Sequence, residues 1–184
     1  AVVIGPGLGQ EAGAERLLDL VLQEAKKLPE LPVVIDADGL NLLAKKRLYS
    51  TLGRQYVLTP HLREMSRLSG KSVQEIADDM TSAVMGQQAG ATIVLKDART
   101  LVSDGDWLYI NLSGNSALST GGSGDVLSGM IGGLLAQGCT QRTAATLAVY
   151  MHGLTAEQYC ESAPPHCMLA RDILEMIPKI GGNS

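Results

Sequence analysis

Three glycines within four residues, followed by an acid, form the stretch with the clearest chemical meaning. The stretch runs from Gly121 to Asp125 (GGSGD), and an apolar run typical of a helix starts at Val126. A glycine-rich loop that opens a helix leaves backbone N–H groups pointing outward, and the helix N-terminus adds about half a positive charge. We therefore expect an anion pocket suited to phosphate.

Asp125 needs a separate explanation, because a carboxylate repels phosphate. A general base that takes a proton from a hydroxyl beside a phosphate donor would explain the acid. The alternative is that Asp125 caps the helix, as Asp often does.

Other polar residues follow predicted strands. Apolar runs predict strands at residues 1–4, 33–36, 56–59 and 92–96. Helices are predicted between and after these strands, at residues 11–28, 40–46, 62–68, 73–88, 142–160 and 170–176, with a further helix that follows the glycine loop and ends near residue 137. This alternation predicts a mainly parallel sheet covered on both faces. Ligands bind such sheets beyond the carboxyl ends of the strands, which is where residues 5–9, 36–41, 59–64 and Lys96 would lie.

Each of these segments also has a purely structural interpretation. The glycines at 5, 7 and 9 form either a flexible turn or a close backbone approach to a ligand. Asp36, Asp38 and Asn41 either order a site, hold Mg²⁺ through water, or stabilise a turn. His61, with Glu64 nearby, is either catalytic or structural.

The loop after the fourth strand has two interpretations as well. Lys96, Arg99 and Thr100 either hold phosphate or ribose oxygens or belong to a loop before a hairpin predicted at 100–103 and 107–111. Ser72 and Glu75 predict a capping box for the helix at 73–88. His152, in an apolar helix, is interpreted as a packed core residue.

Composition limits the class of protein. The 184 residues are 45% hydrophobic and 18% charged with a net charge of −4, which predicts one globular domain over 1–184 and gives no support to nucleic-acid binding. No apolar run reaches the ~18 residues of a membrane helix. The three cysteines lack metal-ligand spacing, so we expect no zinc site and a reducing, cytoplasmic compartment.

With these residues assembled, the sequence resembles the NAD(P)H-hydrate dehydratase family of the ribokinase-like superfamily. The resemblance rests on motifs spread over nearly the whole chain: VIGPGLG from Val3, VIDADGLN from Val34, LTPH from Leu58, VLK from Val94, Gly114-Asn115, GGSGDVLSG from Gly121, His152-Gly153 and MLARDI from Met168. The His of the Thr-Pro-His motif is similar to that of the bacterial, ADP-using members.

The resemblance implies a three-layer αβα sandwich with a mainly parallel sheet and an edge hairpin. It implies repair of hydrated NADH or NADPH by phosphorylation of the ring hydroxyl and loss of phosphate, in which ADP becomes AMP and Mg²⁺ assists. It also implies that the protein assembles as a homo-oligomer, namely a tetramer. The roles it implies are substrate binding by Gly9, His61 and Asp125, catalysis by Asp125, nucleotide binding by Lys96, Asp97, Ala98, Arg99, Thr100, Gly121, Gly122 and Gly124, and ordering of the site by Asp36, Asp38, Asn41, Glu64 and Asn115.

The chain also departs from the family pattern. Arg63 and Asp97 stand where glycines are usual, and Asp97 brings a negative charge close to the expected nucleotide phosphates. The strands that usually precede the first motif are absent from this sequence. Two alternatives therefore stay open: a ribokinase-like kinase of a small alcohol such as a vitamin precursor or sugar, and a nucleotide-binding module without catalysis.

Overall fold

The computed structural model describes residues 1–85 and 90–180, which build a six-stranded sheet. The strands are β1 (Val2–Ile4), β2 (Val33–Ile35), β3 (Tyr56–Leu58), β4 (Thr92–Leu95), β5 (Leu101–Ser103) and β6 (Leu108–Ile110), and they lie side by side in that order. β1 to β4 are parallel, whereas β5 and β6 are antiparallel and form a hairpin at the edge. The predicted parallel sheet with an edge hairpin is confirmed.

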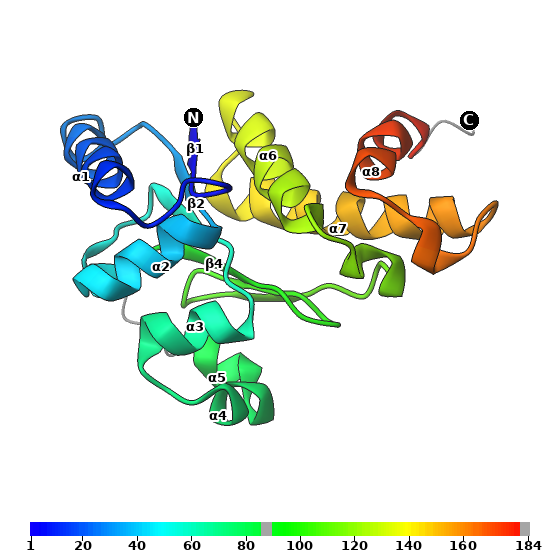
Figure 1. Cartoon of the computed structure of the whole chain (residues 1–184), viewed down its shortest axis with the longest axis horizontal. Helices are drawn as coiled ribbons and strands as arrows, with labels where there is room; N and C mark the ends of the chain where they lie inside the picture. Colours follow the sequence, from blue (N-terminus) through cyan, green and yellow to red (C-terminus); the bar gives the residue numbers. More distant parts are fainter. Residues whose placement is uncertain (86–89, 181–184) are drawn as a thin grey trace.

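Helices cover both faces of the sheet (Figure 1). One face carries α1 (Ala12–Lys27), α2 (Ala37–Lys46), α3 (Leu62–Ser69), α4 (Val73–Asp78) and α5 (Met80–Met85), and the other carries α6 (Ser123–Ala136) and α7 (Gln141–Cys160), against which α8 (Ala170–Met176) packs. Short 3₁₀ turns occur at η1 (Tyr49–Thr51), η2 (Ser116–Ser119), η3 (Pro165–Cys167) and η4 (Ile177–Lys179). The three layers predicted from the sequence are present.

The strands β2 and β3 are apolar at every position because both of their faces are covered. In β2, Val34 packs with α6 and α7, while its neighbours Val33 and Ile35 pack with the helices of the opposite face. All three residues have no exposed surface. Such strands show no polar alternation, in agreement with the patterns seen in the sequence.

The helix predicted at residues 73–88 is two helices in the structure. Ser72 and Glu75 form the expected capping box at the start of α4. The helix then ends at Asp79, whose carboxylate accepts hydrogen bonds from the backbone N–H and the hydroxyl of Ser82 and so starts α5. An Asp at this position stabilises a new helix start, which explains the break. The last predicted residues of that helix, 86–88, lie outside the described residues.

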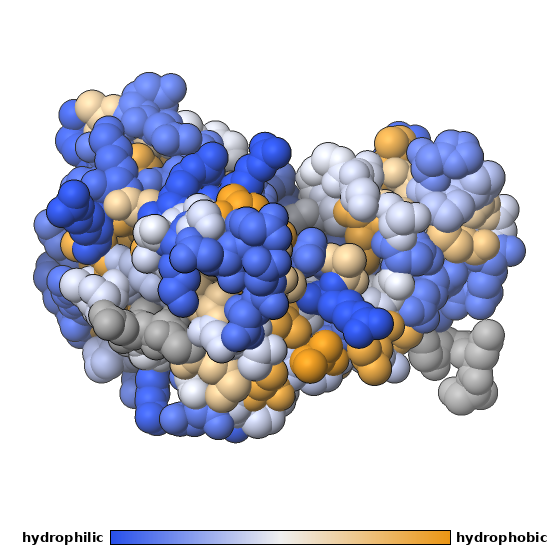
Figure 2. Space-filling model, turned by 90° about the horizontal axis from the view of Figure 1, so that it is seen from below, coloured by the Kyte–Doolittle hydropathy of each residue, from blue (hydrophilic) through white to orange (hydrophobic). Residues whose placement is uncertain are grey.

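The surface carries both polar and apolar residues. Figure 2 shows a face that is mostly hydrophilic, with apolar residues gathered near its middle. The exposed large apolar side chains include Ile110 and Leu112 beside the sheet edge and Leu147 and Tyr150 on α7. Among the described helices, none combines the length and the hydropathy needed to cross a membrane.

Gly5 permits the close packing of the loop after β1 on the loop after β2. A Cβ atom at Gly5 would lie 1.8 Å from the carbonyl oxygen of Asp36, and the Gly5 φ of +126° is one that L-residues rarely adopt. The close approach that Gly5 permits is to the backbone of the chain itself, and the approach to a ligand considered from the sequence stays a prediction.

We predict that Gly5→Ala lowers the free energy of unfolding by at least about 2 kcal/mol, because the substitution adds both a clash and backbone strain. Gly13→Ala is the matched control, since a Cβ at that helical position meets nothing within 4 Å. The control should be neutral or stabilising by up to about 1 kcal/mol. Urea unfolding of the two variants measures the difference, and equal midpoints would contradict the packing argument.

Candidate active site

A cavity of about 870 Å³ opens at the carboxyl ends of the parallel strands. Residues that line it come from the loops after β2, β3 and β4, from the start of α3, from the segment 111–120 that includes η2, from α6 and from α7. Those expected from the sequence are Asp36, His61, Glu64, Lys96, Asp97, Ala98, Thr100, Asn115, Gly124 and Asp125. Ten residues from distant parts of the sequence thus meet in one hollow.

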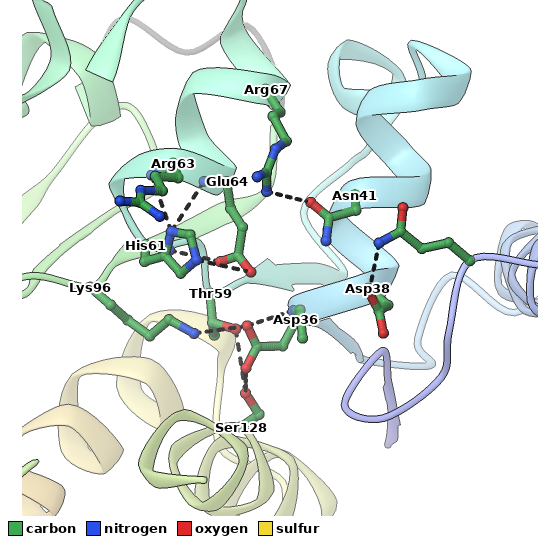
Figure 3. A network of polar contacts seen from close by, with 12 residues as sticks. Asp36, Asp38, Asn41, Thr59, His61, Arg63, Glu64, Arg67, Lys96 and Ser128 are labelled. Carbon is green, nitrogen blue, oxygen red and sulfur yellow. Dashed lines mark hydrogen bonds and ion pairs between the residues drawn. The ribbon is translucent and has the colours of Figure 1, made fainter. Parts of the chain in front are cut away.

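A buried ion pair crosses the floor of this site. Asp36, directly after β2, is 1% exposed, and its Oδ1 lies 2.8 Å from Nζ of Lys96, directly after β4. The same Oδ1 accepts the backbone N–H of Ala37, and Oδ2 accepts the hydroxyl of Ser128 on α6 at 2.6 Å (Figure 3). One carboxylate therefore joins β2, β4 and α6, and its charge is paired with an ammonium group and hydrogen-bonded on both oxygens.

The N-terminus of α6 lies beside Lys96. A Cβ atom at Gly124 would be 3.2 Å from Lys96 Nζ, so the glycine leaves room for the ammonium group. Gly122 occupies the N-cap position with a φ of +85° and supplies no side-chain acceptor for the first turn. The amides of that turn and Lys96 together favour an anion.

Asp125 is the third residue of α6 and not its N-cap, which argues against the capping interpretation. Its side chain is exposed and lines the cavity. Among the described residues, its carboxylate takes part in no hydrogen bond or ion pair, in contrast to that of Asp36. A free carboxylate at the edge of an anion pocket is available to accept a proton.

His61 caps α3 and also lines the cavity. Its Nδ1 accepts the backbone N–H groups of Arg63 and Glu64, and the Glu64 carboxylate accepts the N–H of His61. Because Nδ1 is an acceptor, the neutral ring carries its hydrogen on Nε2, which lies 3.5 Å from Glu64 Oε1. An isolated parallel bridge pairs His61 with Lys96 and holds the two sides of the cavity in register.

Six expected residues do not line the cavity in the part of the chain that the structure describes: Gly9, Asp38, Asn41, Arg99, Gly121 and Gly122. Asp38 instead accepts the N–H of Gly9 and the amide of Gln10, and so links the loops after β1 and β2. Asn41 accepts a hydrogen bond from Arg67 of α3 (Figure 3). Asp38 thus fixes the loop after β1, whereas Asn41 joins the helices α2 and α3.

Sequence motifs did not reveal how the segment before η2 is held. Ser113 donates to the carbonyl of Tyr150, Gly114 N–H donates to Glu157, and Asn115 donates to the carbonyl of Ala156. All three acceptors lie on α7, 37 to 43 residues away in sequence. A separation of that size leaves no local pattern that could have indicated these bonds.

His152 of α7 is 7% exposed, which confirms that it is packed in the interior. It also lines the cavity, with Nε2 3.2 Å from Ser123 Oγ and 3.1 Å from the Ser123 carbonyl oxygen. Burial lowers the pKa of His152 from 6.5 to about 4, and the nearby Lys96 ammonium acts in the same direction. The imidazole is therefore neutral near pH 7.

A second hollow, of about 520 Å³, is lined by Arg47, Arg67 and Lys71, with no acid among the described lining residues. Arg47 and Gly70, next to Lys71, stand at the C-terminal ends of α2 and α3. Cations at these ends offset the negative pole of a helix, so their gathering has a structural reason.

Comparison with known proteins gives one consistent family. Residues 1–179 match the family Carb_kinase, described as NAD(P)H-hydrate dehydratase. An ADP-dependent (S)-NAD(P)H-hydrate dehydratase of Neisseria meningitidis is 44% identical over 169 residues, covering 89% of this chain and 56% of that protein.

Solved structures agree in fold. The ADP/ATP-dependent NAD(P)H-hydrate dehydratase from Bacillus subtilis, co-crystallised with ATP/Mg²⁺, has a TM-score of 0.81 at 30% identity, covering 98% of this chain and 63% of that one. A ribokinase-like superfamily protein from Enterococcus faecalis has a TM-score of 0.85 at 32% identity, with 97% and 62% covered. The fold is ribokinase-like, and the chain spans 56% to 63% of the length of these relatives.

We predict that His152 makes stability depend on pH. Between about pH 6.5 and 4 the unfolded chain binds a proton at this position and the folded chain does not, so stability falls as the pH drops. The loss at about pH 4.5, relative to neutral pH, is about 2 kcal/mol from this residue.

Urea unfolding at both pH values should show a smaller loss for His152→Gln than for the unsubstituted chain. Other titrating groups contribute to both proteins, so the comparison isolates position 152. An identical pH dependence in the two proteins would show that His152 is not held neutral by burial.

Proposed function

This chain belongs to the NAD(P)H-hydrate dehydratase family, and we propose that it uses an adenine nucleotide to return hydrated NADH or NADPH to the intact cofactor. The free carboxylate of Asp125, beside the glycine-opened N-terminus of α6, is the observation that carries the proposal. ADP is the nucleotide we favour, because the Neisseria relative is named ADP-dependent.

The proposed chemistry replaces a poor leaving group with a good one. Asp125 takes the proton of the ring hydroxyl while the oxygen attacks the terminal phosphorus of the nucleotide, so that ADP becomes AMP. The ring nitrogen lone pair then expels phosphate, and loss of a proton from the adjacent carbon restores the double bond. The amides of the α6 N-terminus would stabilise the transferring phosphoryl group.

We assign the nucleotide to the side of the cavity formed by Lys96, Asp97, Ala98 and Thr100, with the phosphates at Gly124. The position of Lys96 Nζ next to Gly124 supports this assignment. Arg99, Gly121 and Gly122 are next in sequence to residues of the cavity lining. We propose that the two glycines contact the bound nucleotide through their backbone and that Arg99 reaches it with its long side chain.

The hydrated nicotinamide is assigned to the side of His61. His61 lines the cavity, and its Nε2, which lies 3.5 Å from Glu64 Oε1, is the ring nitrogen that the helix cap leaves for a contact with the substrate. Gly9 would take part through its loop, which Asp38 holds in place. Asp36, Asn41, Glu64 and Asn115 keep the role of ordering the site, in keeping with the hydrogen bonds that each makes.

Mg²⁺ is proposed as a partner of the nucleotide phosphates. Among residues 1–85 and 90–180, no group of three or more acidic, His or Cys side chains is arranged to hold a metal ion. Mg²⁺ in nucleotide sites usually keeps several waters and binds through substrate phosphates, so the nucleotide would bring most of its ligands. The ion would neutralise part of the phosphate charge.

We further propose one ribokinase-like domain that works in the cytoplasm as a homo-oligomer. A single sheet holds all the described strands, and the three cysteines are free thiols. The apolar side chains exposed at the sheet edge and on α7, Ile110, Leu112, Leu147 and Tyr150, offer a surface that a second copy could cover.

We predict that incubation with hydrated NADH and ADP restores the absorbance of NADH and yields AMP and phosphate. Asp125→Asn should lower the turnover number at least about 100-fold, because proton transfer by a positioned base contributes about that much. Calorimetry should show ADP binding within a few-fold of the unsubstituted chain, since the amide keeps the size of the side chain.

Asp106→Asn is the matched control, because Asp106 is an exposed acid on the hairpin turn outside the cavity lining. It should keep full turnover. Unchanged turnover in Asp125→Asn would remove the base assignment. Nucleotide consumption only with a different alcohol would instead support the kinase alternative, and ADP binding without turnover would support the non-catalytic one.

A further inference from the structure

The contact between Ser123 and His152 fixes which ring nitrogen carries the hydrogen. His152 Nε2 lies 3.1 Å from the Ser123 carbonyl oxygen, and a carbonyl oxygen can only accept. If Nε2 lacked a hydrogen, two acceptors would face each other in the interior. The neutral imidazole must therefore be protonated at Nε2 and donate toward Ser123.

This tautomer determines what the Ser123 hydroxyl can do. The hydroxyl oxygen lies 3.2 Å from the same Nε2, which already carries a hydrogen and cannot accept another. The Oγ of Ser123 is thus an acceptor in this pair, and no other described residue is its hydrogen-bond partner. The hydroxyl proton is left available, in a residue that is 5% exposed yet lines the cavity.

We propose that Ser123 is a phosphate-binding residue, whose hydroxyl donates a hydrogen bond to a phosphate oxygen at the N-terminus of α6, and that His152 is the positioning residue that holds this hydroxyl. This proposal rests on the proposed function in one respect only, namely that the phosphate belongs to ADP. Ser123 was not among the site residues expected from the sequence, because the phosphate pocket was predicted from the glycines around it.

The surroundings favour a phosphate oxygen as the acceptor. Ser123 is the first residue of α6, its neighbour Gly122 supplies no side-chain acceptor, and Gly124 lies against the Lys96 ammonium. His152 itself stays neutral near pH 7 because burial lowers its pKa, so it contributes a directed hydrogen bond and no charge. As a neutral residue, His152 adds no charge to the anion pocket near pH 7.

Calorimetry with ADP, and separately with inorganic phosphate, tests the hydroxyl. Ser123→Ala should weaken binding about 10- to 100-fold, the cost of one hydrogen bond to a charged group. Ser123→Thr keeps the hydroxyl and should bind within about threefold of the unsubstituted chain. Ser50→Ala, an exposed position on the second hollow, is the control and should leave binding unchanged.

The positioning role of His152 has its own variants. His152→Gln can still present an N–H toward Ser123 and should retain most of the affinity, whereas His152→Leu should weaken it about as much as Ser123→Ala. ¹⁵N NMR of labelled histidine should find His152 neutral, with its hydrogen on Nε2, at pH 7 and at pH 5. If His152→Leu does not fold, the two serine variants and the NMR spectrum decide the question.

Equal affinity of Ser123→Ala and the unsubstituted chain would overturn the proposal, as would a hydrogen on Nδ1 or a chain that binds neither ADP nor phosphate. Failure of the proposed function looks different. In that case the unsubstituted chain binds ADP more tightly than Ser123→Ala but does not restore NADH from its hydrate.

Discussion

Asp36 carries a charge that is almost entirely removed from water, and such a charge is tolerated only when its partners are fixed around it. Lys96, Ser128 and the N–H of Ala37 supply those partners. Because they come from β4, α6 and the start of α2, satisfying one carboxylate determines how three elements meet. The position of Lys96 beside the α6 N-terminus follows from the same pair.

Several glycines make this arrangement possible. Gly5 lets one loop pass over the carbonyl of Asp36, and Gly124 leaves space for the Lys96 ammonium. Gly132 plays a similar part away from the site, since a Cβ there would lie 2.4 Å from a side-chain carbon of Val3 on β1. The glycine-rich motifs are therefore required for the approach of one layer to another, besides any role in approaching a ligand.

The sequence allows much of the fold and part of the site to be predicted. The apolar runs indicate the strands because strands buried on both faces lack polar positions, and parallel strands bring their carboxyl ends to one edge. Asp36, His61 and Lys96 are found at that edge for this reason. The hairpin and the Ser72 capping box depend on neighbouring residues, which is why local patterns reveal them.

The remaining features depend on contacts between distant residues. Ser128 reaches Asp36 across 92 positions, and His152 reaches Ser123 across 29, so no spacing rule connects them. Asp38 accepts a hydrogen bond from the backbone of the loop after β1. Its place in the motif does not show whether its side chain faces that loop or a ligand. Burial also decides roles: Asp36 and Asp125 both line the cavity, but the Asp36 carboxylate is enclosed and paired, whereas the Asp125 carboxylate is exposed.

A crystal structure of the chain with ADP and Mg²⁺ tests the central claim most directly, namely that the cavity between Lys96 and Asp125 is a nucleotide site. We predict that the terminal phosphate lies at the first-turn amides of α6, within hydrogen-bond distance of Lys96 Nζ and the Ser123 hydroxyl. The Asp125 carboxylate should face the outer side of that phosphate. ADP bound elsewhere, for example in the hollow lined by Arg47, Arg67 and Lys71, would contradict it.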